Sequence, residues 1–174
     1  ANMVQVGPAS QEGRHIGPVV NEAQFNKIQG LIQAGIDEGA RLVAGGTGRP
    51  EGMNRGYFVK PTVFADATNQ MTIAREEIFG PVAYLASFND ESEGIRLANN
   101  TDYGLANSVW SSDLARCKRV ASQFETGNGW INSHNVVVHG VPYAGVKKSG
   151  MGGGVVSLET LLDYYRNISV IRPL

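Results

Sequence analysis

The chain has 174 residues, of which 42% are hydrophobic and 18% charged, and its formal net charge is -1. This balance is typical of a globular domain and excludes the charge-rich, apolar-poor class of disordered chains. The sequence has no block of basic residues that could bind the phosphates of a nucleic acid, so we expect no nucleic-acid binding. No apolar run approaches the ~20 residues of a membrane span, so we expect no transmembrane segment.

Cysteine and histidine usage bears on location and on metal binding. Cys117 is the only cysteine, so the chain can form no internal disulfide and no cysteine-based metal site, and we expect a reducing cytoplasm. Residues 1–8 lack a charged segment followed by an apolar stretch, so no signal peptide is expected there. The 3 histidines show no metal-ligand spacing, and we assign no metal.

The first half of the chain is predicted to form a helix followed by short strands. Asn21 is a suitable N-cap, Gln24 follows three residues later, and apolar residues keep helical spacing until Gly39 ends the run. We expect Gln24 to be the far half of a capping box. A strand at 41–44 and a β-type stretch at 57–64 follow.

Strands and helices alternate in the second half. Asp90 and Glu93 form a capping box for a helix whose Ile95 and Ala98 are expected to face inward. This alternation favours βαβ units, so the sequence predicts an α/β fold with a parallel sheet. The expected elements are a buried strand at 82–88, this helix, a strand at 106–110, a helix that Ser111 or Ser112 caps and that runs through Phe124, and a strand at 129–132.

Residues 133–156 form an unusually long turn-like stretch, and we expect a binding loop there because long ordered loops in compact domains are often functional. A last helix is expected to begin at Ser157. Residues 166–174 then have the composition of a short β-type tail, which by itself is an exposed edge in need of a partner.

Seven strings, in this order and over nearly the whole chain, resemble the aldehyde dehydrogenase superfamily. The most specific is EEIFGPV. The strings are GPVVNEAQFNKI, EGARLVAGG, GYFVKPTVF, MTIAREEIFGPV, ANNTDYGLANSVWSSDL, GNGWIN and PYAGVKKSGMG.

The resemblance implies an α/β catalytic domain with a parallel sheet and a C-terminal oligomerisation strand. It assigns residues 1–156 to the C-terminal part of the catalytic domain and residues 157–174 to the last helix and the oligomerisation strand. A homo-oligomer formed through that strand is therefore expected.

The resemblance also implies a reaction. The family oxidises an aldehyde to a carboxylic acid with NAD or NADP through a cysteine thiohemiacetal and a thioester. Its nucleophilic cysteine, general-base glutamate and Gly-rich cofactor turn all match positions upstream of Ala1, so we assign no catalytic residue and expect this chain alone to be inactive. The alternatives are a non-catalytic truncated member that serves as an interaction or oligomerisation module, a member that acylates coenzyme A, and an unrelated α/β nucleotide-binding domain.

Four residues are assigned to the cofactor site by the resemblance. Glu77 would accept hydrogen bonds from both hydroxyls of the nicotinamide ribose, and Phe79 would flank the nicotinamide as an apolar wall. Outside the GPV context, they would be a solvated glutamate and a core phenylalanine. Gln24 and Lys27 lie one helical turn apart and would face the cofactor ribose, and their alternatives are the capping box and a solvated lysine.

The loop from 132 to 139 resembles the family's substrate loop. Asn135, Val137 and Tyr143 are assigned to a pocket for a small-molecule aldehyde. Three successive valines expose apolar surface unless something covers them, so this loop either packs internally or meets an apolar substrate. The family often has a bulkier aromatic where Val137 stands, which favours a larger or branched aldehyde here.

Cys117 is interpreted as a structural residue and not as a nucleophile. It lies in the middle of a predicted helix, with Leu114, Ala121 and Phe124 at helical spacing, as a small buried hydrophobic residue does. No neighbouring residue in the sequence would lower its pKa, which a catalytic thiolate requires.

Overall fold

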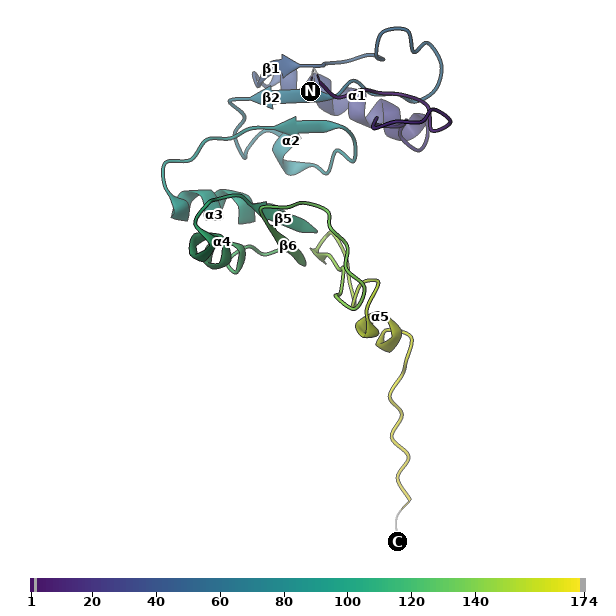
Figure 1. The fold of residues 1–174 in the computed structure, drawn as a ribbon, viewed down its shortest axis with the longest axis vertical. Coiled ribbons are helices and arrows are strands. Elements are labelled where there is room, and N and C mark those ends of the chain that lie inside the picture. The colour runs from purple at the N-terminus through teal and green to yellow at the C-terminus, as the bar shows by residue number, and fades with distance from the viewer. Residues whose placement is uncertain (2, 173–174) are drawn as a thin grey trace. The chain divides into compact units, whose positions relative to one another are not determined.

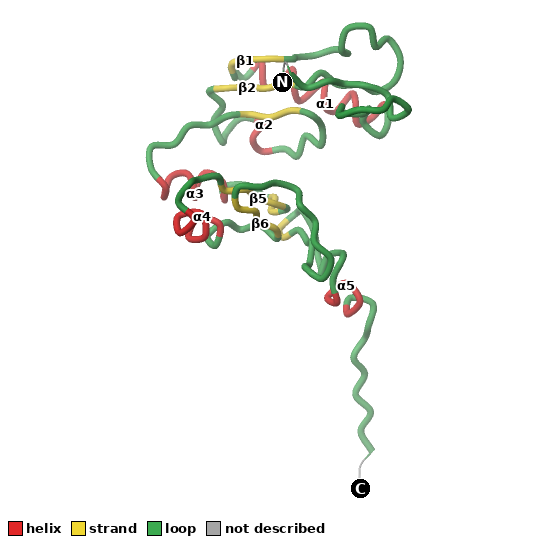
Figure 2. Tube along the Cα trace, in the orientation of Figure 1, coloured by secondary structure: helices red, strands yellow, loops and turns green. Residues whose placement is uncertain are grey.

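Two units of structure follow one another along the chain in the computed structural model, which describes residues 1 and 3–172. The first unit is Ala1–Asn89 and the second is Asp90–Leu174. Figures 1 and 2 show that each unit combines helices with short strands. The predicted α/β class is confirmed, with a parallel strand pair in each unit. The proposed boundary between 156 and 157 stays a prediction.

Helix α1 (Glu22–Asp37) begins where the sequence predicts. The Asn21 side chain accepts a hydrogen bond from the Gln24 backbone N–H at 2.9 Å, which satisfies one of the unpaired donors of the first turn. Gly39 follows the helix with a φ of 88°, a left-handed conformation that glycine adopts without strain. The buried positions of the helix are Phe25, Ile28, Ile32 and Gly35.

A three-stranded sheet packs with α1 in the first unit. Strand β1 (Arg41–Ala44) pairs antiparallel with β2 (Thr62–Ala65), and β2 pairs parallel with β3 (Val82–Tyr84). The short helix α2 (Thr72–Arg75) connects β2 to β3. Burial of apolar side chains from both helices and from β2 stabilises this unit. The core includes Ile28, Ile32, Phe64 and Ile73.

The predicted buried strand at 82–88 is only partly correct. Strand β3 ends at Tyr84, and beyond it Leu85 is 58% and Phe88 61% exposed. β3 is the last strand in the order β1-β2-β3, so among the described residues it has β2 alone as a sheet neighbour. A continuous apolar run indicates burial only where both faces of a strand are covered, and here the run continues past the end of the strand.

Two glycines of α1 give opposite predictions for replacement by alanine. A Cβ at exposed Gly30 would meet nothing within 4 Å, so Gly30→Ala should raise the free energy of unfolding by about 0.5–1 kcal/mol. A Cβ at buried Gly35 would lie 2.8 Å from Ile73 Cγ2, so Gly35→Ala should lower it by about 1–3 kcal/mol. Urea unfolding followed by circular dichroism measures both. Shifts of the two midpoints in the same direction would contradict this packing.

In the second unit, a helix joins two parallel strands, as the alternation predicts. Strand β5 (Ala106–Val109) pairs parallel with β6 (Asn128–Ile131), and α4 (Leu114–Ala121) connects them. Helix α3 (Glu91–Asn99) precedes this motif, and the Asp90 side chain caps it by accepting from the Glu93 N–H at 2.9 Å. The other elements are β4 (Tyr103–Gly104), which pairs antiparallel with β7 (Val146–Lys147), and α5 (Leu158–Leu162).

The predicted N-cap of α4 is wrong. Asp113, and neither Ser111 nor Ser112, caps this helix, because its carboxylate accepts from the Arg116 N–H at 3.0 Å. A carboxylate at this position also interacts favourably with the helix dipole. The Ser111 backbone N–H and carbonyl instead bond the Asn132 side chain, both at 2.9 Å. The helix also ends at Ala121, before the predicted end at 124.

Helix α3 is less buried than its spacing predicts. The prediction that Ile95 and Ala98 face inward is wrong. Ile95 is only partly buried, Ala98 is exposed, and no residue of α3 is fully buried. The helix is joined to α4 by charge, since Glu91 accepts two hydrogen bonds from Arg119 at 2.9 and 2.8 Å. These bonds hold the pKa of the Glu91 carboxyl below its ordinary value. The pair is solvated and adds little stability.

Cys117 is a buried residue of α4, as its spacing predicts. Its side chain is fully shielded from solvent, and its sulfur lies 3.9 Å from the Val109 carbonyl oxygen and 3.7 Å from that of Ser111. The thiol therefore packs against the end of β5, where it serves as a small apolar side chain.

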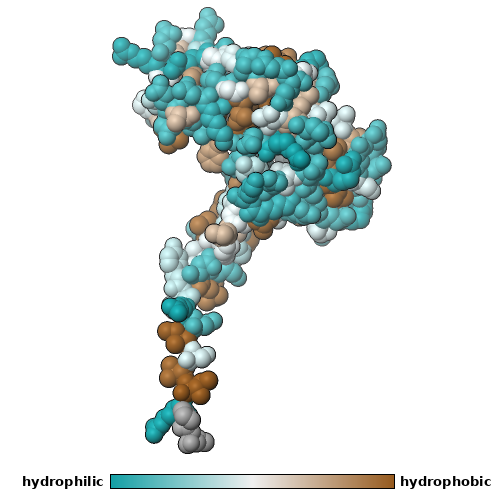
Figure 3. Space-filling view, turned by 180° about the vertical axis from the view of Figure 1, so that it is seen from behind, coloured by the Kyte–Doolittle hydropathy of each residue, from teal (hydrophilic) through white to brown (hydrophobic). Residues whose placement is uncertain are grey.

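The residues after α5 are extended and exposed. From 165 to 172 the chain has neither helix nor strand, and Ile168, Val170 and Ile171 are 77%, 91% and 88% exposed. Figure 3 shows the apolar side chains along this tail. A strand needs a partner, so the predicted β-type tail forms none in a single chain. Its pairing with another subunit stays a prediction.

Candidate functional site

Two side chains of α1 hold the loop that follows α2. The Gln24 Nε2 group donates to the Ile78 carbonyl at 2.9 Å and to the Phe79 carbonyl at 3.3 Å. The Lys27 ammonium donates to the Glu77 carbonyl at 2.9 Å. The structure therefore brings together all four residues that the sequence analysis assigned to one site, although their two segments lie 50 to 55 positions apart.

The predicted capping box at α1 is half wrong. Asn21 caps the helix, but the Gln24 side chain does not return to Asn21 and instead donates to the loop carbonyls. Lys27 is likewise bonded and is not simply a solvated helix lysine. The Gln24 amide can bond the two loop carbonyls, of Ile78 and Phe79, whereas a capping box would give it one bond, from the Asn21 backbone N–H.

The loop itself lies close against α1. Ile78 is buried, and a Cβ at Gly80 would lie 2.5 Å from Ile28 Cδ1, so only glycine allows this approach. Phe79 has a φ of 55°, which is unfavourable for an aromatic residue, and the residue is 71% exposed. The backbone at this point directs an apolar ring outward, which has no benefit for the core.

Glu77 presents an exposed carboxylate from the same loop. Among residues 1 and 3–172, no side chain or backbone group pairs with its carboxylate, although its backbone carbonyl is bonded to Lys27. An ionised carboxylate is an acceptor with two oxygens, so it can bind two hydroxyl groups at once. The loop thus offers an acceptor for a diol two residues before an exposed aromatic surface.

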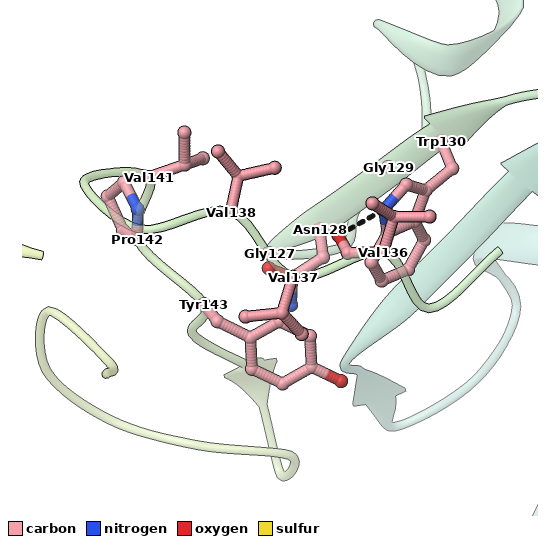
Figure 4. Close-up of a pocket in the computed structure, with 10 residues that line it drawn as sticks. All are labelled: Gly127, Asn128, Gly129, Trp130, Val136, Val137, Val138, Val141, Pro142 and Tyr143. Atoms are coloured by element: carbon pink, nitrogen blue, oxygen red, sulfur yellow. Dashed lines mark hydrogen bonds between the residues drawn. The ribbon is translucent and has the colours of Figure 1, made fainter. Parts of the chain in front are cut away.

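A second candidate site is a hollow in the second unit beside β6. Its volume is about 290 Å³, and its walls are mainly apolar. Figure 4 shows valine side chains and two aromatic rings around it. The residues that line it are Gly127, Asn128, Gly129, Trp130, Val136, Val137, Val138, Val141, Pro142 and Tyr143.

Trp130 holds the valine loop over β6. Its indole N–H donates to the Val136 carbonyl at 2.9 Å (Figure 4). Its ring contacts His134 edge-on, with 5.4 Å between the ring centroids. The Ser108 hydroxyl hydrogen-bonds His134 Nδ1 at 2.8 Å. On the other side, the ring centroid of Tyr143 lies 6.3 Å from that of Trp130. The loop is therefore fixed at its start by β5 and β6.

The structure places two of the three predicted pocket residues in this hollow. Val137 and Tyr143 line it, whereas Asn135 lies in the same loop but not among the lining residues. Trp130 and Pro142 also line the hollow but were not predicted to do so. Trp130 belongs to β6, and its aromatic side chain is a common feature of binding pockets. For Pro142, the available signal was its position next to Tyr143.

No three His, Cys, Asp or Glu side chains of the described residues lie together as a metal site requires. In the same part of the chain, no helix combines the length and apolar composition that crossing a membrane needs.

Comparison with known proteins identifies the family. The sequence pattern of the aldehyde dehydrogenase family matches residues 1–171. The chain belongs to the aldehyde dehydrogenase family. It is 44% identical over 164 residues to a putative aldehyde dehydrogenase of Staphylococcus saprophyticus, which covers 93% of this chain and 34% of that protein. It is 45% identical over 159 residues to betaine aldehyde dehydrogenase of Brucella anthropi, which covers 89% and 32%.

Solved structures of the family have the same fold. An aldehyde dehydrogenase from Bartonella henselae is 55% identical with a TM-score of 0.81, over 86% of this chain and 31% of that one. The Mycobacterium tuberculosis aldehyde dehydrogenase complexed with NAD+ is 45% identical with a TM-score of 0.84, over 91% and 33%. The chain thus spans about a third of the length of the relatives it matches.

Proposed function

We propose that this chain is the C-terminal part of a longer aldehyde dehydrogenase that oxidises an aldehyde to a carboxylic acid with NAD or NADP. The observation that carries the proposal is the Glu77–Phe79 loop, which presents an unpaired carboxylate and an exposed ring from a backbone anchored to α1. Family membership supports the reaction, and the one-third coverage supports a longer protein.

The loop fits a nicotinamide nucleotide. Glu77 would accept hydrogen bonds from the two ribose hydroxyls, and Phe79 would offer an apolar surface to the nicotinamide. When bound, this cofactor supplies the hydride acceptor of the oxidation. The NAD+ complex of the Mycobacterium tuberculosis relative supports this choice of cofactor.

The hollow beside β6 fits the apolar part of an aldehyde. Val137 and Tyr143 line it with other aliphatic and aromatic side chains, and such a lining binds carbon chains by removing apolar surface from water. Asn135, on the same loop, would lie near the rim. The valines occupy little volume, which favours a larger or branched aldehyde.

The chain alone should not oxidise aldehydes, whereas the longer protein should. We expect no rise in reduced-nicotinamide absorbance when the 174-residue chain is mixed with NAD(P) and a panel of aldehydes, because its single cysteine, Cys117, is buried and out of reach of a substrate. The same assay on the protein extended upstream should show turnover. Activity of the short chain that disappears in Cys117→Ala would overturn the proposal and the structural role of this thiol.

The products of the longer protein separate the alternatives. A carboxylic acid supports the hydrolytic reaction, and a thioester formed only when coenzyme A is added supports the acylating reaction. If the extended protein is folded but shows no turnover with or without coenzyme A, the remaining alternative is a non-catalytic interaction or oligomerisation module.

A further inference from the structure

We propose that Gln24 and Lys27 are positioning residues, which hold the Glu77–Phe79 loop by its backbone carbonyls and do not themselves bind the cofactor. The proposal deepens the function proposed above, and rests on it for the identity of the ligand. The hydrogen bonds that carry it are independent of that function.

The amide nitrogen of Gln24 is directed at the loop. It has two N–H groups, and it donates to the carbonyls of Ile78 at 2.9 Å and of Phe79 at 3.3 Å. A ligand would compete with these two carbonyls for the same nitrogen. Lys27 donates one of its three N–H groups to the Glu77 carbonyl. Helix α1 therefore bonds three successive carbonyls of the loop.

The loop needs this support because its backbone is strained. Phe79 has a φ of 55°, and a non-glycine residue in this region persists only where its surroundings impose the conformation. Burial of Ile78 and the contact of Gly80 with Ile28 fix the end of the loop near the core. The bonds from Gln24 and Lys27 fix the carbonyls, which these apolar contacts leave free to rotate.

Fixing these carbonyls also restricts the backbone from which the Glu77 side chain projects. The Lys27 bond holds the peptide plane that follows Glu77, and the Gln24 bonds hold the next two planes. With the flanking plane held, the Cα–Cβ bond of Glu77 has less freedom. A carboxylate that must bind two hydroxyls together benefits from this preorganisation.

Backbone order in the loop gives the test, and it can be measured without any cofactor. We would compare ¹⁵N order parameters of Ile78, Phe79 and Gly80 in the 174-residue chain and in the variants Gln24→Leu and Lys27→Met. We expect a fall from about 0.85, typical of rigid backbone, to below about 0.6 in each variant. Lys27→Arg, which keeps a donor at this position, should retain most of the order.

Gln33→Leu is the matched control on the same helix, because Gln33 donates to Asp37 within α1 and not to the loop. It should leave the loop amides unchanged. The order parameters of Ile28 and Ile32 report whether each variant keeps α1 folded. If Gln24→Leu does not fold, exposed Lys27 still permits the test, since its side chain contributes nothing to the core.

The outcomes separate this proposal from the proposed function. Unchanged loop order in both variants would overturn the positioning role. Unchanged order combined with lost NAD(P) affinity in the extended protein would show that the two residues bind the cofactor directly, which also overturns it. Reduced loop order, in an extended protein whose wild-type form does not bind NAD(P), would support the positioning role and contradict only the function.

Discussion

Replacing Glu77 by glutamine in the extended protein is expected to weaken NAD(P) binding about 10- to 150-fold, with the free energy of unfolding unchanged. Hydrogen bonds to a charged group contribute about 1.5–3 kcal/mol, and each 1.4 kcal/mol is about tenfold in affinity. Glutamine keeps the size of the side chain but removes the charge and turns one acceptor into a donor. Because the Glu77 side chain is exposed, folding should not depend on it.

Glu76→Gln provides the control for this prediction. Glu76 is also exposed and is the adjacent residue, so both variants remove one negative charge from the same loop. A titration with NAD+ measures affinity, and a urea midpoint measures stability. If Glu77→Gln leaves both the cofactor affinity and the rate of hydride transfer unchanged, Glu77 is not part of the site. Equal losses in the two variants would indicate a general charge effect in place of specific hydrogen bonds.

The exposed tail is expected to make the chain associate. We propose that it adds a strand to another copy of the chain, because Ile168, Val170 and Ile171 are 77%, 91% and 88% exposed and lie in an extended segment. Unpaired extended segments with apolar side chains pair readily with a sheet edge. Light scattering should give a mass that rises with concentration for the full chain, and a monomer for a chain that ends at Tyr165.

Two point variants sharpen this comparison. Val170→Lys introduces a charge at an apolar position of the tail and should reduce association, since charged side chains on edge strands oppose pairing. Asn167→Lys adds the same charge at a polar position nearby and should have a smaller effect. A monomer for both the full and the shortened chain, with the tail amides protected from exchange, would show that the tail pairs within its own chain.

The sequence by itself determined those features that depend on residues close together in the chain. The caps Asn21 and Asp90 were predicted correctly because an N-cap bond spans three residues. The parallel pair β5 and β6 followed from the alternation of strand and helix. The family was also evident from the sequence, since ordered motifs such as EEIFGPV are a property of the chain and not of its packing.

Only the tertiary structure determined which hydrogen-bond and packing partners lie far away in the sequence. Asp113, and neither predicted serine, caps α4, while Asn132, 21 positions away, bonds the Ser111 backbone and the Ser111 hydroxyl accepts from the Asp113 N–H. Trp130 became part of a hollow because the valine loop folds back onto its strand. The spacing of apolar residues cannot predict these long-range hydrogen bonds. It indicates which face of a helix or strand is apolar, but not which residues of another segment pack against that face.

Gln24 shows this limit at the candidate site. Its spacing from Asn21 indicated a capping box, which is the best partner within reach along the helix. The fold brings two carbonyls 54 and 55 positions away to the same amide nitrogen, which donates to both. The sequence identified the residue types at this site, and the packing of the loop on α1 determined that Gln24 and Lys27 bond the backbone of the Glu77–Phe79 loop.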